Sequence, residues 1–505
     1  MFLNMVAKIL GFAEKQVIAH CFGAGRTADA YLAATGLSYS AFDFVREIVQ
    51  SALIPLLFAR DSEGRDMQTQ ARSALLVALL LGCTGAVMIV WLPGLVAHSV
   101  APGVDSRTMA ELTSLLRWSA PALPLLCVAG VTYALLNASG HFGLSASGDI
   151  LAKFVLIGAC LTAAFSSFPR APVLSLGVVA AFAMRLLTQL PSAAKSLRPG
   201  NASPARPATS VGPLLTVVIP LGVGAAISQL GELGTNYFSS YLPVGTIAAR
   251  AYAKKIVDMP IFVLPYVLSV VSFPALSRLS ARGEKAAFFS LFGRVVTVTA
   301  LALAPLAAIM AIYSVPIVRL LLEHGMFSRH ASETTSLALR YYAIGIPAFA
   351  LDVLLTPTFY ARLRMWTPTL LGAATVFVKL LIMWMFARRF GLIAVASALT
   401  ISKGLKVSVL GWALCAWNGI PFSQFAREVL LGYLLPLSFA YLVVSIANRG
   451  PFQFDPWGRL NAAYFRSVAL NGLLFVATFL GIVGALPSRS ASMIRFIVTR
   501  RFSRS

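Results

Sequence analysis

The sequence predicts an all-α polytopic membrane protein with about fourteen transmembrane helices, arranged as two six-helix lobes around a central cavity plus two additional C-terminal helices. Of its 505 residues, 58% are hydrophobic and only 12% are charged, where a soluble protein carries roughly 25% charge. Mean hydropathy is +0.80. Apolar runs of about 20 residues recur along the whole chain, and each can cross a bilayer as a helix. Because the runs are continuous rather than alternating, helices are favoured over a β-barrel.

A hydropathy criterion places these spans along the chain. Their approximate limits are 1–22, 31–58, 74–97, 112–136, 149–168, 171–190, 213–240, 246–276, 286–313, 331–360, 366–388, 391–413, 427–448 and 463–486. This order predicts five parts, namely an N-terminal lobe (1–190), a linker (191–212), a C-terminal lobe (213–413), two additional spans (414–486) and a basic tail (487–505). A weak internal match between the segments around Gly25 and Gly245 supports the two-lobe division, since each segment is predicted as helix, small-residue loop, helix.

The net charge of +23 is explained by membrane topology. Basic residues are spread thinly between apolar spans, which does not favour nucleic-acid binding. With the N-terminus inside, the predicted cytoplasmic loops and tail hold roughly twice as many Lys and Arg as the opposite loops, so both termini are predicted to be cytoplasmic. The basic residues assigned to the cytoplasmic side include Arg278, Arg282, Lys285, Arg362, Arg364, Lys403 and Lys406.

Cysteine and histidine usage indicates neither a metal site nor a cofactor. The five cysteines are scattered in or near apolar segments, and no CxxC pair occurs. The five histidines show no HExxH or similar spacing. A disulfide framework is therefore not expected either.

Several predicted spans contain cations that a hydrophobic chain could have avoided. They are Lys8 and Lys15 in the first span, Arg46 in the second, and Lys254 with Lys255 in the eighth. Each such charge costs roughly 2.5–3.5 kcal/mol at the centre of a transmembrane helix. The functional interpretation is an electropositive cavity for a phosphate-bearing ligand. The alternative is that these residues form buried ion pairs that fix helix register, or extend to the membrane surface.

Acidic residues lie close enough to hold these cations while the site is empty. Asp43, Arg46 and Glu47 have i, i+3 and i+4 spacing, so Arg46 can pair with either acid on one helix face. Asp258 follows Lys254 and Lys255 by one helical turn, and Glu14 precedes Lys15.

Three further charged residues give weaker signals. Glu232 is explained equally well as a cation or proton site and as a polar residue hydrogen-bonded between helices. Lys379 is predicted to be isolated in the eleventh span, and Asp352 to face a loop.

Four stretches carry a family resemblance. They are ILGFAEKQVIAHCFGAGRTADAY at 9–31, YAKKIVDMPIFVLPYVLSVVSFPALSRL at 252–279, LLEHGMFS at 321–328 and AFALDVLLTPTFYARLRMWTP at 348–368. In these stretches, and in their order, the chain resembles the MurJ (MviN) family of lipid II flippases, within the multidrug/oligosaccharidyl-lipid/polysaccharide exporter superfamily. The resemblance covers nearly the whole chain.

The resemblance implies a transporter rather than an enzyme. Such a protein would lie in the bacterial cytoplasmic (inner) membrane and move lipid II, an undecaprenyl-pyrophosphate-linked peptidoglycan precursor, from the inner to the outer leaflet by alternating access. Implied partners are this lipid-linked saccharide, membrane lipids and cell-envelope synthesis proteins. Carried over by position, Lys8 and Lys255 stand where the family has cavity arginines, Asp29 matches a family Asp, and Asp258 matches an acid one turn after Lys255.

The chain also departs from the family pattern. Glu14 stands where the family has an Arg, and LSYSAFDFVRE replaces a second-span motif resembling LPNLLRR, so Arg46 is expected to compensate. The family sodium site uses acidic or amide residues in the seventh and eleventh spans, whereas here Lys379 lies near a ligand position. A fixed ammonium repels sodium, which predicts that this site is not used.

These departures leave alternative functions open. One is export of another polyprenyl-linked saccharide, such as an exopolysaccharide repeat unit. A cation-coupled drug exporter is less favoured because its cavity should be acidic. A membrane glycosyltransferase is disfavoured because no loop is long enough to fold alone and no histidine pair has catalytic spacing. A non-transporting scaffold in an envelope assembly complex is a further alternative.

Overall fold

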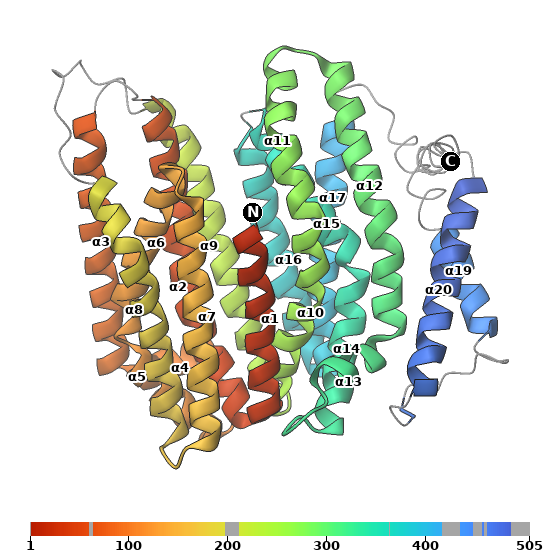
Figure 1. The fold of residues 1–505 in the computed structure, drawn as a ribbon, viewed down its shortest axis with the longest axis horizontal. Helices are drawn as coiled ribbons and strands as arrows, with labels where there is room; N and C mark the ends of the chain where they lie inside the picture. Colours follow the sequence, from red (N-terminus) through yellow and green to blue (C-terminus); the bar gives the residue numbers. More distant parts are fainter. Residues whose placement is uncertain are drawn as a thin grey trace. The chain divides into compact units, whose positions relative to one another are not determined.

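The computed structural model describes residues 2–59, 64–196, 212–362, 364–416, 435–447, 457–458 and 462–485. Within these ranges every regular element is a helix, and no strand occurs (Figure 1). The predicted all-α architecture is therefore confirmed. The predicted basic tail lies outside the described residues, as does most of the predicted linker.

In the described ranges, fewer helices pass as membrane spans than the sequence predicts. In the described ranges, eight helices are long and apolar enough to cross a membrane, or ten spans if each of two bent pairs counts as one. The predicted count of about fourteen is not confirmed. One physical reason is the first helix, α1 (Phe2–Phe22), which carries Lys8, Glu14 and Lys15 in its middle. These three charges lower the hydropathy of α1, so the helix does not pass a hydropathy test for a membrane span.

Proline residues interrupt three segments that were predicted as single spans, which are 112–136, 246–276 and 331–360. They consist of α5 (Ser106–Ser119) with α6 (Ala122–Ala138), α10 (Thr246–Val263) with α11 (Pro265–Ala281), and α14 (Arg329–Ile344) with α15 (Ile346–Tyr360). The first pair is bent by 58° and the last by 48°. Pro121, Pro265 and Pro347 lie at these breaks. Proline lacks an N–H donor and restricts the residue before it, so a continuous helix is unfavourable there.

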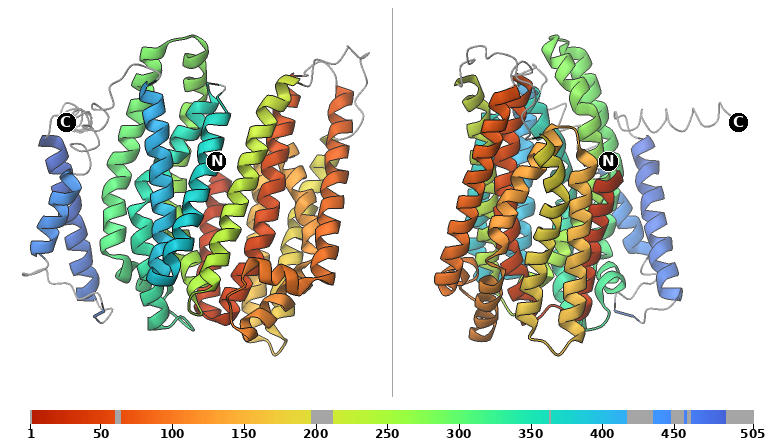
Figure 2. Two further views of the ribbon diagram at one scale, coloured as in Figure 1. Left: turned by 180° about the vertical axis from the view of Figure 1, so that it is seen from behind. Right: turned by 60° about the vertical axis from the view of Figure 1, so that its left-hand side comes forward.

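The first of two compact units comprises Met1–Lys255, Leu322–Thr334 and Met365–Val395. Besides α1, α5, α6 and the start of α10, it contains α2 (Arg26–Ala59), α3 (Gly64–Trp91), α4 (Pro93–Val100), α7 (Phe142–Phe165), α8 (Arg170–Ser196), α9 (Gly212–Ser240) and α16 (Trp366–Phe390). Helix α7 packs against α1 and α8, while α9 packs between α2 and α16 (Figure 2).

The second unit comprises Ile256–Leu321, Thr335–Arg364 and Ala396–Ser505. It contains α11, α15, α12 (Lys285–Ile312), most of α13 (Ser314–Leu322), most of α17 (Leu392–Ala416), α19 (Leu435–Ala447) and α20 (Ala462–Ala485). Helix α12 packs against α11 and α15. On another face, Ala304 of α12 packs with Phe475 and Phe479 of α20. These units do not follow the predicted lobe boundaries, and the two-lobe division stays a prediction.

Within the first unit, the two segments of the weak internal repeat contact each other. The Asp29 carboxylate on α2 accepts hydrogen bonds from the backbone N–H groups of Gly245 (2.6 Å) and Ala248 (2.7 Å) at the start of α10. In return, the Tyr252 hydroxyl donates to the Gly23 carbonyl at 2.8 Å. Gly245 has φ +93°, and a methyl group there would lie 2.3 Å from the Ala24 carbonyl oxygen. The loop after α1 and the loop after α9 are therefore fastened together.

Candidate functional site

A buried carboxylate on α1 is held by two lysines. Glu14 is 2% exposed, and its Oε1 lies 3.3 Å from Lys15 Nζ. Its Oε2 accepts a hydrogen bond from Lys153 Nζ on α7 at 2.6 Å. Lys153 also donates to the Tyr39 hydroxyl on α2 at 3.0 Å and lies over that ring. The pairing is required physically, because a buried carboxylate without a cation is strongly destabilising.

A third lysine, Lys255, acts on the same carboxylate, and Lys8 acts in turn on Lys255. The ammonium of Lys255, near the middle of α10, interacts electrostatically with Lys8, Lys15, Lys153 and Glu14. It also lies beside Gly11, where an added methyl group would be 3.1 Å from Lys255 Nζ. A glycine thus gives this ammonium access to the surface of α1. We call Glu14 with Lys8, Lys15, Lys153 and Lys255 the Glu14 cluster.

The Glu14 cluster carries more positive charge than its single carboxylate can neutralise. Four lysines and one glutamate give a net formal charge of +3. Lysine ammonium groups are compact point charges that suit phosphate oxygens without a fixed fork geometry. Chemically, the cluster is suited to hold an anion with more than one negative charge. Sequence reasoning predicted four of these residues and missed Lys153, although a lone lysine in the apolar run GDILAKFVLIG was a detectable signal.

A second charged group, the Arg46 patch, lies on α2, α7 and α8 of the same unit, where two arginines face three carboxylates. Arg46 contacts Asp43 at 2.9 Å and Glu47 at 3.8 Å, which are the two contacts expected from the sequence spacing. Arg185 pairs with Asp149. Both guanidinium groups lie over the Phe42 ring, Arg46 at 5.7 Å and Arg185 at 4.0 Å from its centroid.

Donors in this patch remain available for a polar ligand. The Nε atoms of Arg46 and Arg185 are buried and have no hydrogen-bond partner among the described residues, and the same holds for Gln189 Nε2. Buried donors are normally satisfied, so three orphaned ones together indicate a place where a polar ligand fits. Arg185 and Gln189 were not predicted from the sequence, because their helix also has the pattern of an ordinary apolar span.

The remaining predicted site residues have other surroundings. Lys254 and Asp258 are both half-buried on α10, and their predicted pairing across one turn stays a prediction. The Asp29 carboxylate accepts its hydrogen bonds from backbone N–H groups at the start of α10, and none of these donors is a lysine. Carboxylates at helix N-termini are stabilised by the unsatisfied N–H groups there, so Asp29 serves to fix α10 against α2.

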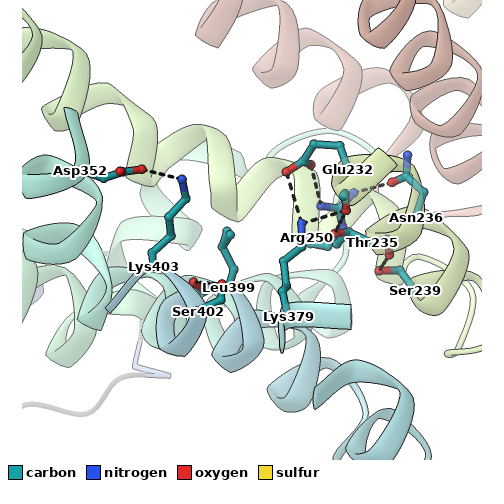
Figure 3. Close-up of polar contacts among 11 residues, drawn as sticks. Glu232, Thr235, Asn236, Ser239, Arg250, Asp352, Lys379, Leu399, Ser402 and Lys403 are labelled. Carbon is teal, nitrogen blue, oxygen red and sulfur yellow. Dashed lines mark hydrogen bonds and ion pairs between the residues drawn. The ribbon is translucent and has the colours of Figure 1, made fainter. Parts of the chain in front are cut away.

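A third charged group joins α9, α10 and α16 (Figure 3). Glu232 lies 3.9 Å from Lys379 Nζ and 4.0 Å from an Arg250 nitrogen. Lys379 is 4% exposed and donates to the Gly231 carbonyl at 2.8 Å, while Arg250 donates to the Asn236 side chain. The prediction that Lys379 is isolated is therefore wrong. Its long side chain reaches from α16 to α9, which a single-span view of the sequence does not show.

The second unit contains its own charged group on α15 and α17. Asp352 contacts Lys403 at 2.6 Å (Figure 3) and Lys406 at 2.7 Å, and it accepts a hydrogen bond from Thr356. Two sequence predictions are corrected here. Asp352 is part of a buried ion-pair group rather than facing a loop, and Lys403 and Lys406 lie within α17 rather than in a cytoplasmic loop. Their i, i+3 spacing on one helix face allows both to reach the same carboxylate.

Metal binding finds no support in the described part of the chain, where no three His, Cys, Asp or Glu side chains come together. The Glu14 cluster and the groups around Glu232 and Asp352 each hold more cations than carboxylates, whereas two arginines face three carboxylates around Arg46. The groups with an excess of cations favour binding of an anion.

Comparison with known proteins identifies the family of the chain. A sequence model of the lipid II flippase MurJ family matches residues 18–451. The chain belongs to the lipid II flippase MurJ family. A protein described as a probable lipid II flippase MurJ from Rhizobium meliloti (strain 1021) is 27% identical over 99% of this chain and 95% of its own length.

Solved structures show the same fold. A lipid II flippase MurJ in an inward closed conformation superposes with a TM-score of 0.75 at 19% identity, covering 95% of this chain and 97% of that one. A multidrug resistance MATE family transporter in an inward-facing conformation gives a TM-score of 0.66 at 12% identity, over 82% of this chain and 95% of the other. The fold is thus that of MurJ and MATE-like transporters, and the chain is an integral inner membrane protein of a transporter family.

Proposed function

We propose that this MurJ family member translocates lipid II from the inner to the outer leaflet by alternating access, with the Glu14 cluster binding the pyrophosphate. The observation that carries the proposal is the set of three lysines, Lys15, Lys153 and Lys255, around one buried carboxylate, with Lys8 beside Lys255. A pyrophosphate carries several negative charges on neighbouring oxygens. Four ammonium groups supply the donors and the counter-charge that water would otherwise provide.

The transport task follows from the cost of moving charge through hydrocarbon. An ionised group that leaves water without compensation loses tens of kcal/mol by idealised solvation estimates. A cavity that surrounds the pyrophosphate with ammonium groups replaces the lost hydration, while the lipid tail stays in the membrane. The protein then needs only to change conformation, and no covalent step is involved.

Glu14 has a defined part in this cycle. In the empty site its carboxylate neutralises Lys15 and Lys153, which keeps the buried lysines from repelling one another. An arriving pyrophosphate competes with Glu14 for the same ammonium groups. Glu14 therefore lowers affinity enough for release, whereas a cluster of lysines alone would hold the ligand too tightly.

The Arg46 patch gives a second contact. The orphaned donors of Arg46, Arg185 and Gln189 suit hydroxyl, amide and carboxylate oxygens of a saccharide or peptide headgroup. We assign Lys254 and Asp258 supporting roles beside Lys255 on α10. Both chain termini are placed in the cytoplasm, as the distribution of loop charges predicts.

Sodium coupling is not part of the proposed cycle. Lys379 Nζ lies against the Gly231 carbonyl and the Glu232 carboxylate. A carbonyl and a carboxylate are the ligands that a hard cation prefers, and here a tethered ammonium occupies them.

A second candidate substrate is another polyprenyl-pyrophosphate-linked saccharide, such as an exopolysaccharide repeat unit. It is favoured by the replacement of the family's second-span basic motif with LSYSAFDFVRE and by Glu14 itself. The pyrophosphate contacts would be the same, and only the headgroup contacts near Arg46 would differ.

The proposal is tested by ligand affinity in the purified full-length chain. Lipid II binding would be measured in detergent micelles for the wild type, Lys153→Gln with Lys255→Gln, and Arg389→Gln. Arg389 is exposed at the end of α16 and serves as a control for the loss of one cation outside the Glu14 cluster. Loss of binding in the double variant alone supports the site. Equal binding in all three proteins would remove the Glu14 cluster from the site, and binding of undecaprenyl pyrophosphate without binding of lipid II would favour the second candidate.

A further inference from the structure

A small basic cavity lies in the second unit, among residues that the transport cycle does not use. Its volume is about 260 Å³, and Lys285, Arg362 and Arg364 line it together with Phe288, Ser280 and Gly283. None of the described lining residues is acidic. The cavity lies where the turn between α11 and α12 meets the end of α15, so it is at the ends of helices rather than in their middle.

Two backbone turns place the cations at the cavity. Gly283 has φ +70°, a conformation that favours glycine, and it reverses the chain between α11 and the first residue of α12, Lys285. On the other side of the cavity, the N–H groups of Arg362 and Arg364 both bond to the Phe359 carbonyl at 3.1 Å. This turn ends α15 and places two arginines beside the α11–α12 turn.

The guanidinium of Arg362 is oriented by aromatic rings. It lies 4.5 Å from the ring centroid of Phe288, which is 1% exposed, and 5.3 Å from that of Phe289. Partial burial, followed by the neighbouring charge of Arg364, lowers the pKa of Arg362. Two guanidinium groups that repel each other in a partly buried place gain from an anion between them.

We propose that this cavity binds the phosphate of an anionic phospholipid headgroup from the adjacent leaflet. Basic pockets at the cytoplasmic ends of transmembrane helices bind such headgroups, and sequence charge places Lys285, Arg362 and Arg364 on the cytoplasmic side. A planar guanidinium fits two phosphate oxygens at once. Exposed apolar residues further along α11, Val270 and Val271, give the acyl chains of such a lipid an apolar surface.

The occupant is assigned to a lipid rather than to free phosphate because of its setting. A cavity at the ends of spanning helices lies at the depth of headgroups, where an anionic lipid is present at high local concentration. The site is separate in composition from the Glu14 cluster, since the two share no residue. Binding here would anchor α11, α12 and α15 to the leaflet while substrate binds elsewhere.

The test uses purified full-length protein and thermal unfolding in neutral detergent with added phosphatidylglycerol, phosphatidylcholine or inorganic phosphate. We expect phosphatidylglycerol to raise the unfolding temperature of the wild type and the other two additives to leave it unchanged. Arg362→Gln with Arg364→Gln should weaken phosphatidylglycerol binding by about fivefold for each charge removed. Arg282→Gln is the control, because Arg282 lies in the same turn, is exposed, and does not line the cavity.

Each outcome decides the assignment. A loss of about fivefold in Arg282→Gln, equal to the loss per charge in the double variant, would show general surface attraction and overturn the site. An equal temperature shift with inorganic phosphate would overturn the lipid. If the double variant fails to fold, Lys285→Gln on the exposed first turn of α12 is the second variant, and unchanged phosphatidylglycerol affinity in it would also overturn the proposal. None of these measurements depends on lipid II.

Discussion

Glu14 Oε2 lies 2.6 Å from Lys153 Nζ, and this contact joins α1 to α7. The carboxylate is 2% exposed, so the pair is shielded from water. Two other groups repeat the arrangement of one carboxylate between two cations, at an exposed Glu232 with the buried Arg250 and Lys379, and at a half-buried Asp352 with its two lysines. Each leaves one positive charge in excess. In these groups the cations therefore outnumber the carboxylates.

The first prediction concerns Glu14→Gln, which keeps the size of the side chain and removes its charge. The lysines of the Glu14 cluster would then have no competing carboxylate. We expect the Kd for undecaprenyl pyrophosphate to fall by about tenfold, corresponding to about 1.4 kcal/mol, and transport to slow because release is slower. Affinity is measured by titration in micelles and transport in vesicles. Weaker binding in Glu14→Gln would show that Glu14 helps to hold the ligand rather than to release it.

The second prediction concerns the energy of the Glu14–Lys153 pair. Lys153→Gln leaves a buried carboxylate short of one cation, which should destabilise the chain by about 3 kcal/mol. In the double variant with Glu14→Gln the loss should be largely recovered, since neither charge is then unpaired. Thermal unfolding of the wild type, both single variants and the double variant gives the coupling energy. Additive losses would mean that the two side chains do not depend on each other.

The third prediction concerns the junction of the loops after α1 and α9. Gly245→Ala would place a methyl group 2.3 Å from the Ala24 carbonyl at φ +93°, and we expect a loss of about 1–3 kcal/mol for the strained backbone alone. Gly283→Ala is a useful control, because Gly283 also has a positive φ but open space around it. A lower unfolding temperature for Gly245→Ala than for Gly283→Ala is expected. Equal temperatures would show that the junction does not constrain the unit.

The fourth prediction concerns sodium. Because the Lys379 ammonium occupies the Gly231 carbonyl and the Glu232 carboxylate, transport by the wild type should be the same in sodium and in potassium buffers. Vesicle assays in matched salts measure this directly. Potassium should not stimulate transport by Lys379→Ala. Stimulation of this variant by sodium would show that the Gly231 carbonyl and the Glu232 carboxylate bind a cation once the ammonium is gone. Sodium-dependent transport that Lys379→Ala abolishes would contradict this account.

The sequence predicted the fold class because apolar runs and the family motifs act over long stretches of chain. It also located Lys8, Lys15, Lys255 and Glu14, since charges in apolar runs stand out. Helix breaks at Pro121 and Pro347 were missed because hydropathy averages over them. The partners of Lys379 and Asp352 were missed for another reason. Each contact joins helices far apart in sequence, and spacing along one helix carries no information about it.

The central claim is that the Glu14 cluster carries lipid II across the membrane. Its most direct measurement is complementation in a bacterium depleted of its own MurJ, with outer-leaflet lipid II scored by a probe added outside. The wild-type chain should restore growth and expose lipid II, Arg389→Gln should do the same, and Lys153→Gln with Lys255→Gln should do neither while present in the membrane at equal amounts. Exposure of lipid II by the double variant, or none by the wild type, would contradict the claim.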